Sequence, residues 1–112
     1  MASVHYEADI SIQFMGRHPG EIVADIDWDE TGHGPVTGIA KLKMLKTFTY
    51  PIITGSEGTM ADDKSFHVYA KLQSQFGNGS LDCNLDVSPD GTIHGTIPLL
   101  KKVVLVFDGH LR

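Results

Sequence analysis

The segment Val4–Phe14 alternates apolar and polar residues without interruption, and it constrains the fold more than any other part of the chain. Side chains in a β-strand point to opposite faces with a period of two, so this pattern predicts a half-buried strand. Its eleven residues would extend about 36 Å, roughly twice the usual strand length. A strand of this length bends or crosses a whole small domain.

The rest of the chain has the turn residues and short apolar runs that are typical of a β-protein. Its 112 residues are the size of one domain, and a hydrophobic content of 41% is enough for a core. Twelve glycines and five prolines fall between short apolar runs, as turns do between strands. We expect further strands at Glu21–Trp28, Thr47–Ile53 and Lys101–Phe107, with a long polar loop at Thr54–Lys64.

The segment Val36–Leu45 fits two patterns. Alternation of Ala40, Leu42 and Met44 with lysines indicates a strand, whereas a three-residue repeat of apolar positions would suit a helix. Neighbouring strands and Gly38 favour the strand. Pro51 lacks an N–H donor, so its strand should lie at an edge or contain a bulge.

Two turn motifs predict how strands pair in the second half of the chain. A two-residue Asn78–Gly79 loop is a strong hairpin signal. It would place Phe76 opposite Leu81, Leu72 opposite Leu85 and Ala70 opposite Val87. The turn Ser88–Thr92 contains proline and glycine at positions that suit a three-residue loop, and it would place Val87 opposite Ile93.

These elements predict an all-β single domain over residues 1–112. Seven or eight antiparallel strands in an open sheet would leave an apolar face in water, so the sheet should close as a small barrel or fold into a strongly bent sandwich.

The charge balance limits the classes of partner. A net charge of −5 repels nucleic acid and anionic membranes on average, so neither is expected as a partner. Lysines do cluster at Lys41, Lys43 and Lys46 and at residues 101–102, but a solvated strand face explains them as well.

The single cysteine and the N-terminal sequence suggest a compartment. Cys83 has no partner for an intramolecular disulfide, which fits a reducing cytosol. No signal-peptide pattern precedes the first strand, and no apolar run has the length of a membrane span. We therefore expect a cytoplasmic protein.

No metal or cofactor motif is evident. The acidic run Asp25, Asp27, Asp29 and Glu30 fails as a helix-loop-helix calcium loop, because the sixth position holds Glu30 and the twelfth holds Val36. Six histidines form no close metal-binding pair. The acidic run is therefore interpreted as a solvated strand edge or as a docking patch for a basic partner.

Catalytic motifs are also lacking, and an enzyme is the less favoured class. The expected registers place Lys71 opposite Asp86 and Asp86 opposite His94, which makes this row a weak catalytic candidate. A stabilising row of cross-strand charges explains the same residues.

Two binding functions remain. The first is a non-catalytic protein that acts through protein–protein contact, either by forming a homodimer through the apolar last strand or through its acidic surface. The alternative is small-molecule binding in the mouth or interior of a barrel. Aromatic side chains often line such sites, so Tyr6, Trp28 and Phe48 are the candidate ligand contacts.

Overall fold

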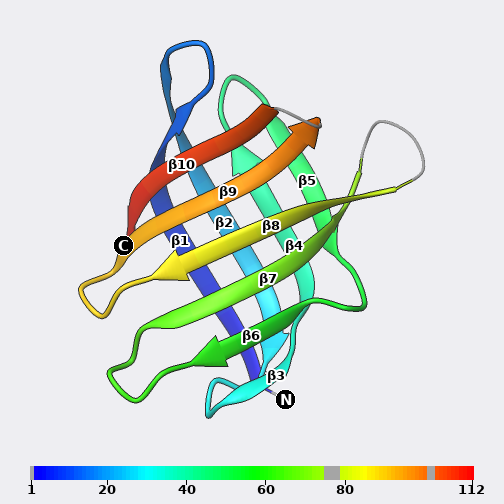
Figure 1. Ribbon diagram of the computed structural model, residues 1–112, viewed down its shortest axis with the longest axis vertical. Helices are drawn as coiled ribbons and strands as arrows, with labels where there is room; N and C mark the ends of the chain where they lie inside the picture. The colour runs from blue at the N-terminus through cyan, green and yellow to red at the C-terminus, as the bar shows by residue number, and fades with distance from the viewer. Residues whose placement is uncertain (1, 75–78, 101–102) are drawn as a thin grey trace.

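The computed structural model describes residues 2–74, 79–100 and 103–112, and it confirms the all-β barrel (Figure 1). The described strands are β1 (Ala2–Gln13), β2 (Arg17–Trp28), β3 (His33–Pro35), β4 (Thr37–Lys43), β5 (Thr47–Ile52), β6 (Glu57–Met60), β7 (Phe66–Gln73), β8 (Ser80–Val87), β9 (Thr92–Leu100) and β10 (Val103–Leu111). Within these ranges there is no helix with the length and hydropathy needed to cross a membrane.

Eight of the strands close into a ring. The order β5-β4-β2-β1-β10-β9-β8-β7 returns to β5, and every neighbouring pair is antiparallel. The two additional strands lie outside this ring, because β6 pairs with the first half of β7 and β3 pairs with β6. Strict alternation of direction puts the hairpin turns 14–16 and 44–46 at the same end of the barrel. We call this end the rim and the opposite end the base.

The alternation of the first strand decides which side chains face inward. Ala8, Ile10 and Ile12 are buried inside the barrel, whereas Glu7 and Asp9 are exposed outside. β1 pairs with β2 along all twelve residues and with β10 over its second half. The long strand therefore crosses the whole domain, as its length indicates.

The ambiguous segment is a strand, but the expected long loop is not wholly a loop. β4 covers residues 37–43 of the ambiguous segment. Within the expected loop Thr54–Lys64, residues 57–60 form β6, and residues 33–35 also pair as β3. Glycine and polar residues gave these short strands no periodic signal, since their pairing with β7 and with each other is a tertiary contact.

One predicted register is wrong and one is confirmed. In the β7–β8 pair Leu72 lies opposite Leu81 and Ala70 opposite Cys83, four residues away from the predicted register. A shift of four leaves every side chain on the same face, so alternation could not detect it. Asn78 of the predicted Asn78–Gly79 loop and Phe76 lie outside the described residues. In the β8–β9 pair Val87 lies opposite Ile93, as predicted.

The environment of two further strands was only partly anticipated. β5 pairs with β4 throughout, and within the described residues it pairs with β7 at Ile52, next to Pro51. The nearly all-apolar sequence of the last strand predicts that both of its faces are covered. Phe107 is buried, but Val104 on the opposite face of β10 is 51% exposed, so this chain covers one face only.

Candidate ligand-binding cavity

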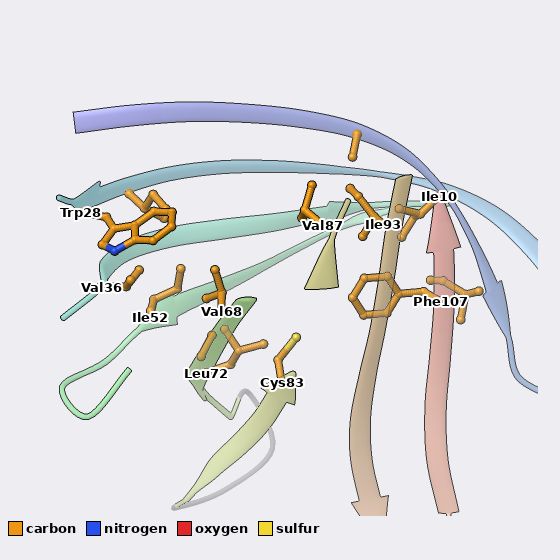
Figure 2. Close-up of a cluster of buried hydrophobic side chains, with 14 residues drawn as sticks. Ile10, Trp28, Val36, Ile52, Val68, Leu72, Cys83, Val87, Ile93 and Phe107 are labelled. Atoms are coloured by element: carbon orange, nitrogen blue, oxygen red, sulfur yellow. The ribbon is translucent and has the colours of Figure 1, made fainter. Parts of the chain in front are cut away.

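The base of the barrel is closed by tightly packed aromatic and apolar groups. Trp28 and Val36 are completely buried, and the rings of Trp28 and Phe66 pack with centroids 5.6 Å apart. A Cβ added at Gly58 would lie 2.5 Å from the Trp28 ring, so only glycine allows this contact. Figure 2 shows Trp28 and Val36 together at one end of the buried cluster and Ile10 and Phe107 at the other end.

Two hydrogen-bond networks support this base. The Ser56 hydroxyl is buried, donates to the carbonyl of Ile53 at 2.9 Å and accepts from the Lys71 N–H at 2.8 Å. The Tyr6 hydroxyl donates to Glu30 at 2.8 Å. Partial burial and this carboxylate raise the pKa of Tyr6. Each contact ties a loop at the base to a barrel strand.

Above the base, the barrel encloses a cavity of about 410 Å³. All eight strands of the ring contribute lining residues, and nearly all of these residues are apolar. The lining includes Phe14, His18 and Met44, which lie in or beside the rim turns and are exposed. The cavity therefore extends from the packed base to the rim.

Small side chains account for the unfilled space. Ala8, Ala24, Ala40 and Ala70 all face the cavity, and Ala24 lies directly opposite Ala40 in the β2–β4 pair. An eight-stranded barrel is just wide enough for side chains to fill it or for one small ligand to enter. Alanine at four inward positions favours the second arrangement.

Few polar groups face this cavity. The Tyr50 ring lines it, and among the described residues we find no hydrogen-bond partner for the Tyr50 hydroxyl. Burial raises the pKa of Tyr50. At the rim, His18 is within 3.1 Å of the Phe14 carbonyl oxygen through its Nε2 atom. Tyr50 is thus one of the few lining residues that carry a hydrogen-bonding group.

Cys83 also lines the cavity and is buried. Burial raises the pKa of its thiol to about 12, so the reactive thiolate form is scarce at neutral pH. Cys83 therefore acts here as a small apolar side chain rather than a nucleophile.

The three aromatic residues expected to contact a ligand have separate positions. Tyr6 lines the cavity, as expected. Trp28 belongs to the base instead and is not part of the lining. Phe48 is half-buried outside the lining, with the Lys46 ammonium 5.7 Å from its ring centroid. Sequence alone missed Tyr50, His18 and the alanines, although small residues at inward strand positions were a usable signal.

The acidic run is engaged within the chain. Each of its residues has a local partner: His5 for Asp25, Ser3 for Asp27, Thr31 for Asp29 and Tyr6 for Glu30. These contacts explain the run as a set of cross-strand and turn interactions at the base.

The weak catalytic row does not form as predicted. Lys71 lies opposite Asp82, because the β7–β8 register differs from the expected one. Asp86 lies opposite His94, as predicted, but it accepts a hydrogen bond from His67 at 2.7 Å. All these carboxylate and imidazole groups are exposed on the outer face. Within the described residues, no three His, Cys, Asp or Glu side chains cluster closely enough to hold a metal ion.

Comparison of the chain with protein-family models, with curated proteins and with solved structures found no match.

Proposed function

We propose that this protein binds a small apolar or amphiphilic molecule inside the barrel. The observation that carries the proposal is the cavity of about 410 Å³, apolar along its length and continuous with the rim. Ligand sites in proteins are mostly apolar concavities of about 300–1,000 Å³ with a few polar groups.

The size of the cavity gives an energetic reason to fill it. At about 24 cal/mol per Å³, a sealed empty cavity of this volume would cost roughly 10 kcal/mol, comparable with the stability of a whole domain. Water can enter at the rim and lowers this cost, but it forms no hydrogen bonds with apolar walls. An apolar ligand restores those contacts, at about 0.8 kcal/mol per buried methylene group.

The polar groups suggest the kind of molecule. The Tyr50 hydroxyl can donate a hydrogen bond to one oxygen atom of a ligand whose chain lies along the apolar wall. A single-chain amphiphile, such as a long-chain alcohol or fatty acid, satisfies both requirements.

Calorimetry with dodecanol, combined with thermal unfolding, tests the proposal. We expect saturable binding to one site and a rise in Tm. Ala40→Phe should fill the cavity and abolish binding, whereas Ile39→Phe on the outer face of the same strand should leave binding unchanged. Absence of binding by the unaltered protein to dodecanol, dodecanoate and anilinonaphthalene sulfonate would contradict the proposal.

Self-association is a second candidate, favoured by the exposed apolar surface at Val104 on β10. The partners found for all four residues of the acidic run weaken the related idea of an acidic docking patch. Sedimentation velocity tests self-association: a dimer that dissociates in Val104→Ser would support it, and a monomer at high concentration would exclude it.

A further inference from the structure

The rim combines exposed apolar turns with the opening of the cavity. Met15 and Leu45, at the tips of the two described rim turns, are 93% and 106% exposed. Phe14 and Met44 beside them are also exposed and line the cavity. Four of the six exposed large apolar side chains in the described ranges therefore belong to these two turns.

The two turns belong to neighbouring hairpins. β2 and β4 are paired up to Glu21 and Lys43, which brings the ends of both hairpins together. A Cβ added at Gly20 would lie 3.3 Å from Cγ of Met44, so the Met44 side chain packs over the β2 backbone. The apolar groups thus lie on neighbouring hairpins around the cavity opening.

Charge is distributed unevenly between rim and base. Residues 10–20 and 38–52, which form the two rim hairpins, contain no aspartate or glutamate. Their basic residues are Arg17, Lys41, Lys43 and Lys46. The base carries the acidic run and the acidic residues of β6 and of the following turn: Asp25, Asp27, Asp29, Glu30, Glu57, Asp62 and Asp63. Glu21, opposite Lys43, and Asp108, which accepts a hydrogen bond from Gln13, lie beside these hairpins, so the basic excess is confined to the hairpins themselves, whereas the base is acidic.

We propose that the rim docks on the surface of an anionic lipid bilayer. Met15 and Leu45 would enter the interfacial region, while the lysines and Arg17 contact anionic headgroups. Apolar side chains flanked by basic residues are the combination that holds proteins at such surfaces. An acidic bilayer matches the charge of the rim and repels the base, so it also orients the barrel.

The bilayer fits the rim better than a protein partner does, because the cavity opens on the same surface. An apolar molecule could pass from the bilayer into the barrel without crossing water. This second step rests on the proposed function, whereas the docking itself rests on the rim residues alone.

Sedimentation with vesicles tests the docking. We expect binding to vesicles of phosphatidylcholine mixed with phosphatidylglycerol, weaker binding to phosphatidylcholine alone, and loss of the difference at high salt. The double variant Met15→Asn with Leu45→Asn should lower binding at least tenfold. Ile39→Asn, an exposed apolar residue away from the turns, is the matched control and should bind like the unaltered protein.

Lys43→Gln with Lys46→Gln should reduce binding to anionic vesicles and leave binding to neutral vesicles unchanged. Equal binding to both lipid compositions, or equal binding by the double turn variant, would overturn the proposal. Self-association that the turn variants abolish, without vesicle binding, would also overturn it in favour of a second copy of the chain. Dodecanol calorimetry on the same variants without vesicles reports the cavity separately, so failure of docking and failure of ligand binding are distinguishable.

Discussion

The base and the rim of this barrel are built from the same alternating strands but differ in packing: the base is filled with buried side chains, and the rim exposes apolar ones. At the base, Trp28 is completely buried and contacts Phe66 and the backbone of Gly58. In the middle of the barrel Ala24 lies opposite Ala40, and at the rim Met15 and Leu45 are the most exposed large apolar side chains of the described residues. We therefore expect the base to contribute most of the stability, and the proposed binding surface lies at the rim.

The comparison teaches how a small barrel can keep a cavity. A uniformly packed interior would leave no space, and a uniformly open one would not fold. Strand pairing supports the dense packing of the base, because β6 extends the sheet there by pairing with the first half of β7. The variants below test whether the two ends differ as the packing indicates.

The largest expected effect is at the base. Trp28→Ala should lower the free energy of unfolding by about 3–5 kcal/mol, because a large buried ring leaves a cavity that the rigid surroundings cannot fill. Leu45→Ala at the rim should change it by less than about 0.5 kcal/mol. Urea unfolding of both variants checks this, and similar losses would refute the division between base and rim.

The second largest loss of stability is expected from a substitution that disturbs one contact at the base, between Gly58 and Trp28. Gly58→Ala should destabilise by about 1–3 kcal/mol, since the added methyl group would overlap the buried Trp28 ring. Gly34 lies directly opposite in the β3–β6 pair and has no atom within 4 Å of an added Cβ. Gly34→Ala should therefore be nearly neutral in the same urea experiment, and an equal cost at both positions would speak against a steric origin.

The two cavity tyrosines should separate stability from binding. Tyr6→Phe removes the hydrogen bond to Glu30 and should cost about 1 kcal/mol of stability. Tyr50→Phe should leave stability within about 0.5 kcal/mol but weaken dodecanol binding about fivefold, the equivalent of one hydrogen bond. Calorimetry and urea unfolding on both variants measure this, and unchanged affinity in Tyr50→Phe would remove that hydroxyl from the site.

The smallest effect depends on pH. The hydrogen bond to Asp25 raises the pKa of His5 above its usual value of 6.5. A raised folded-state pKa stabilises the protein below the unfolded pKa, and this contribution disappears as pH rises through the folded pKa. His5→Gln should therefore be slightly less stable than the unaltered protein at pH 5 and equal to it at pH 9. NMR titration should show a lower His5 pKa in Asp25→Asn, and the same value in both proteins would exclude this partner.

Much of the fold was predictable because it depends on local alternation. The pattern in Val4–Phe14 sorted inward from outward residues correctly, and the Pro89–Gly91 turn predicted the β8–β9 register. The β7–β8 register was not predictable in this way, since a shift of four preserves the alternation. The expected Lys71–Asp86 pair failed for that reason alone.

The candidate site was less predictable than the fold. Of the aromatic residues proposed as ligand contacts, Tyr6 lines the cavity and Trp28 packs in the base, and alternation alone does not distinguish these two inward positions. Tyr50 and the alanines could be identified as lining residues only from the structure, because they come from separate strands that meet around the cavity when the barrel closes.

By itself, the sequence determined an antiparallel β-domain with apolar residues on one face and charged residues on the other, because alternation and turn residues act over a few positions. Tertiary structure decided that the ring closes, that β3 and β6 close the base with Trp28, and that alanines from separate strands face a common cavity. These properties depend on contacts between residues far apart in the chain. No local pattern records them, because a strand's sequence specifies its faces but not the side chains that lie across the barrel from it.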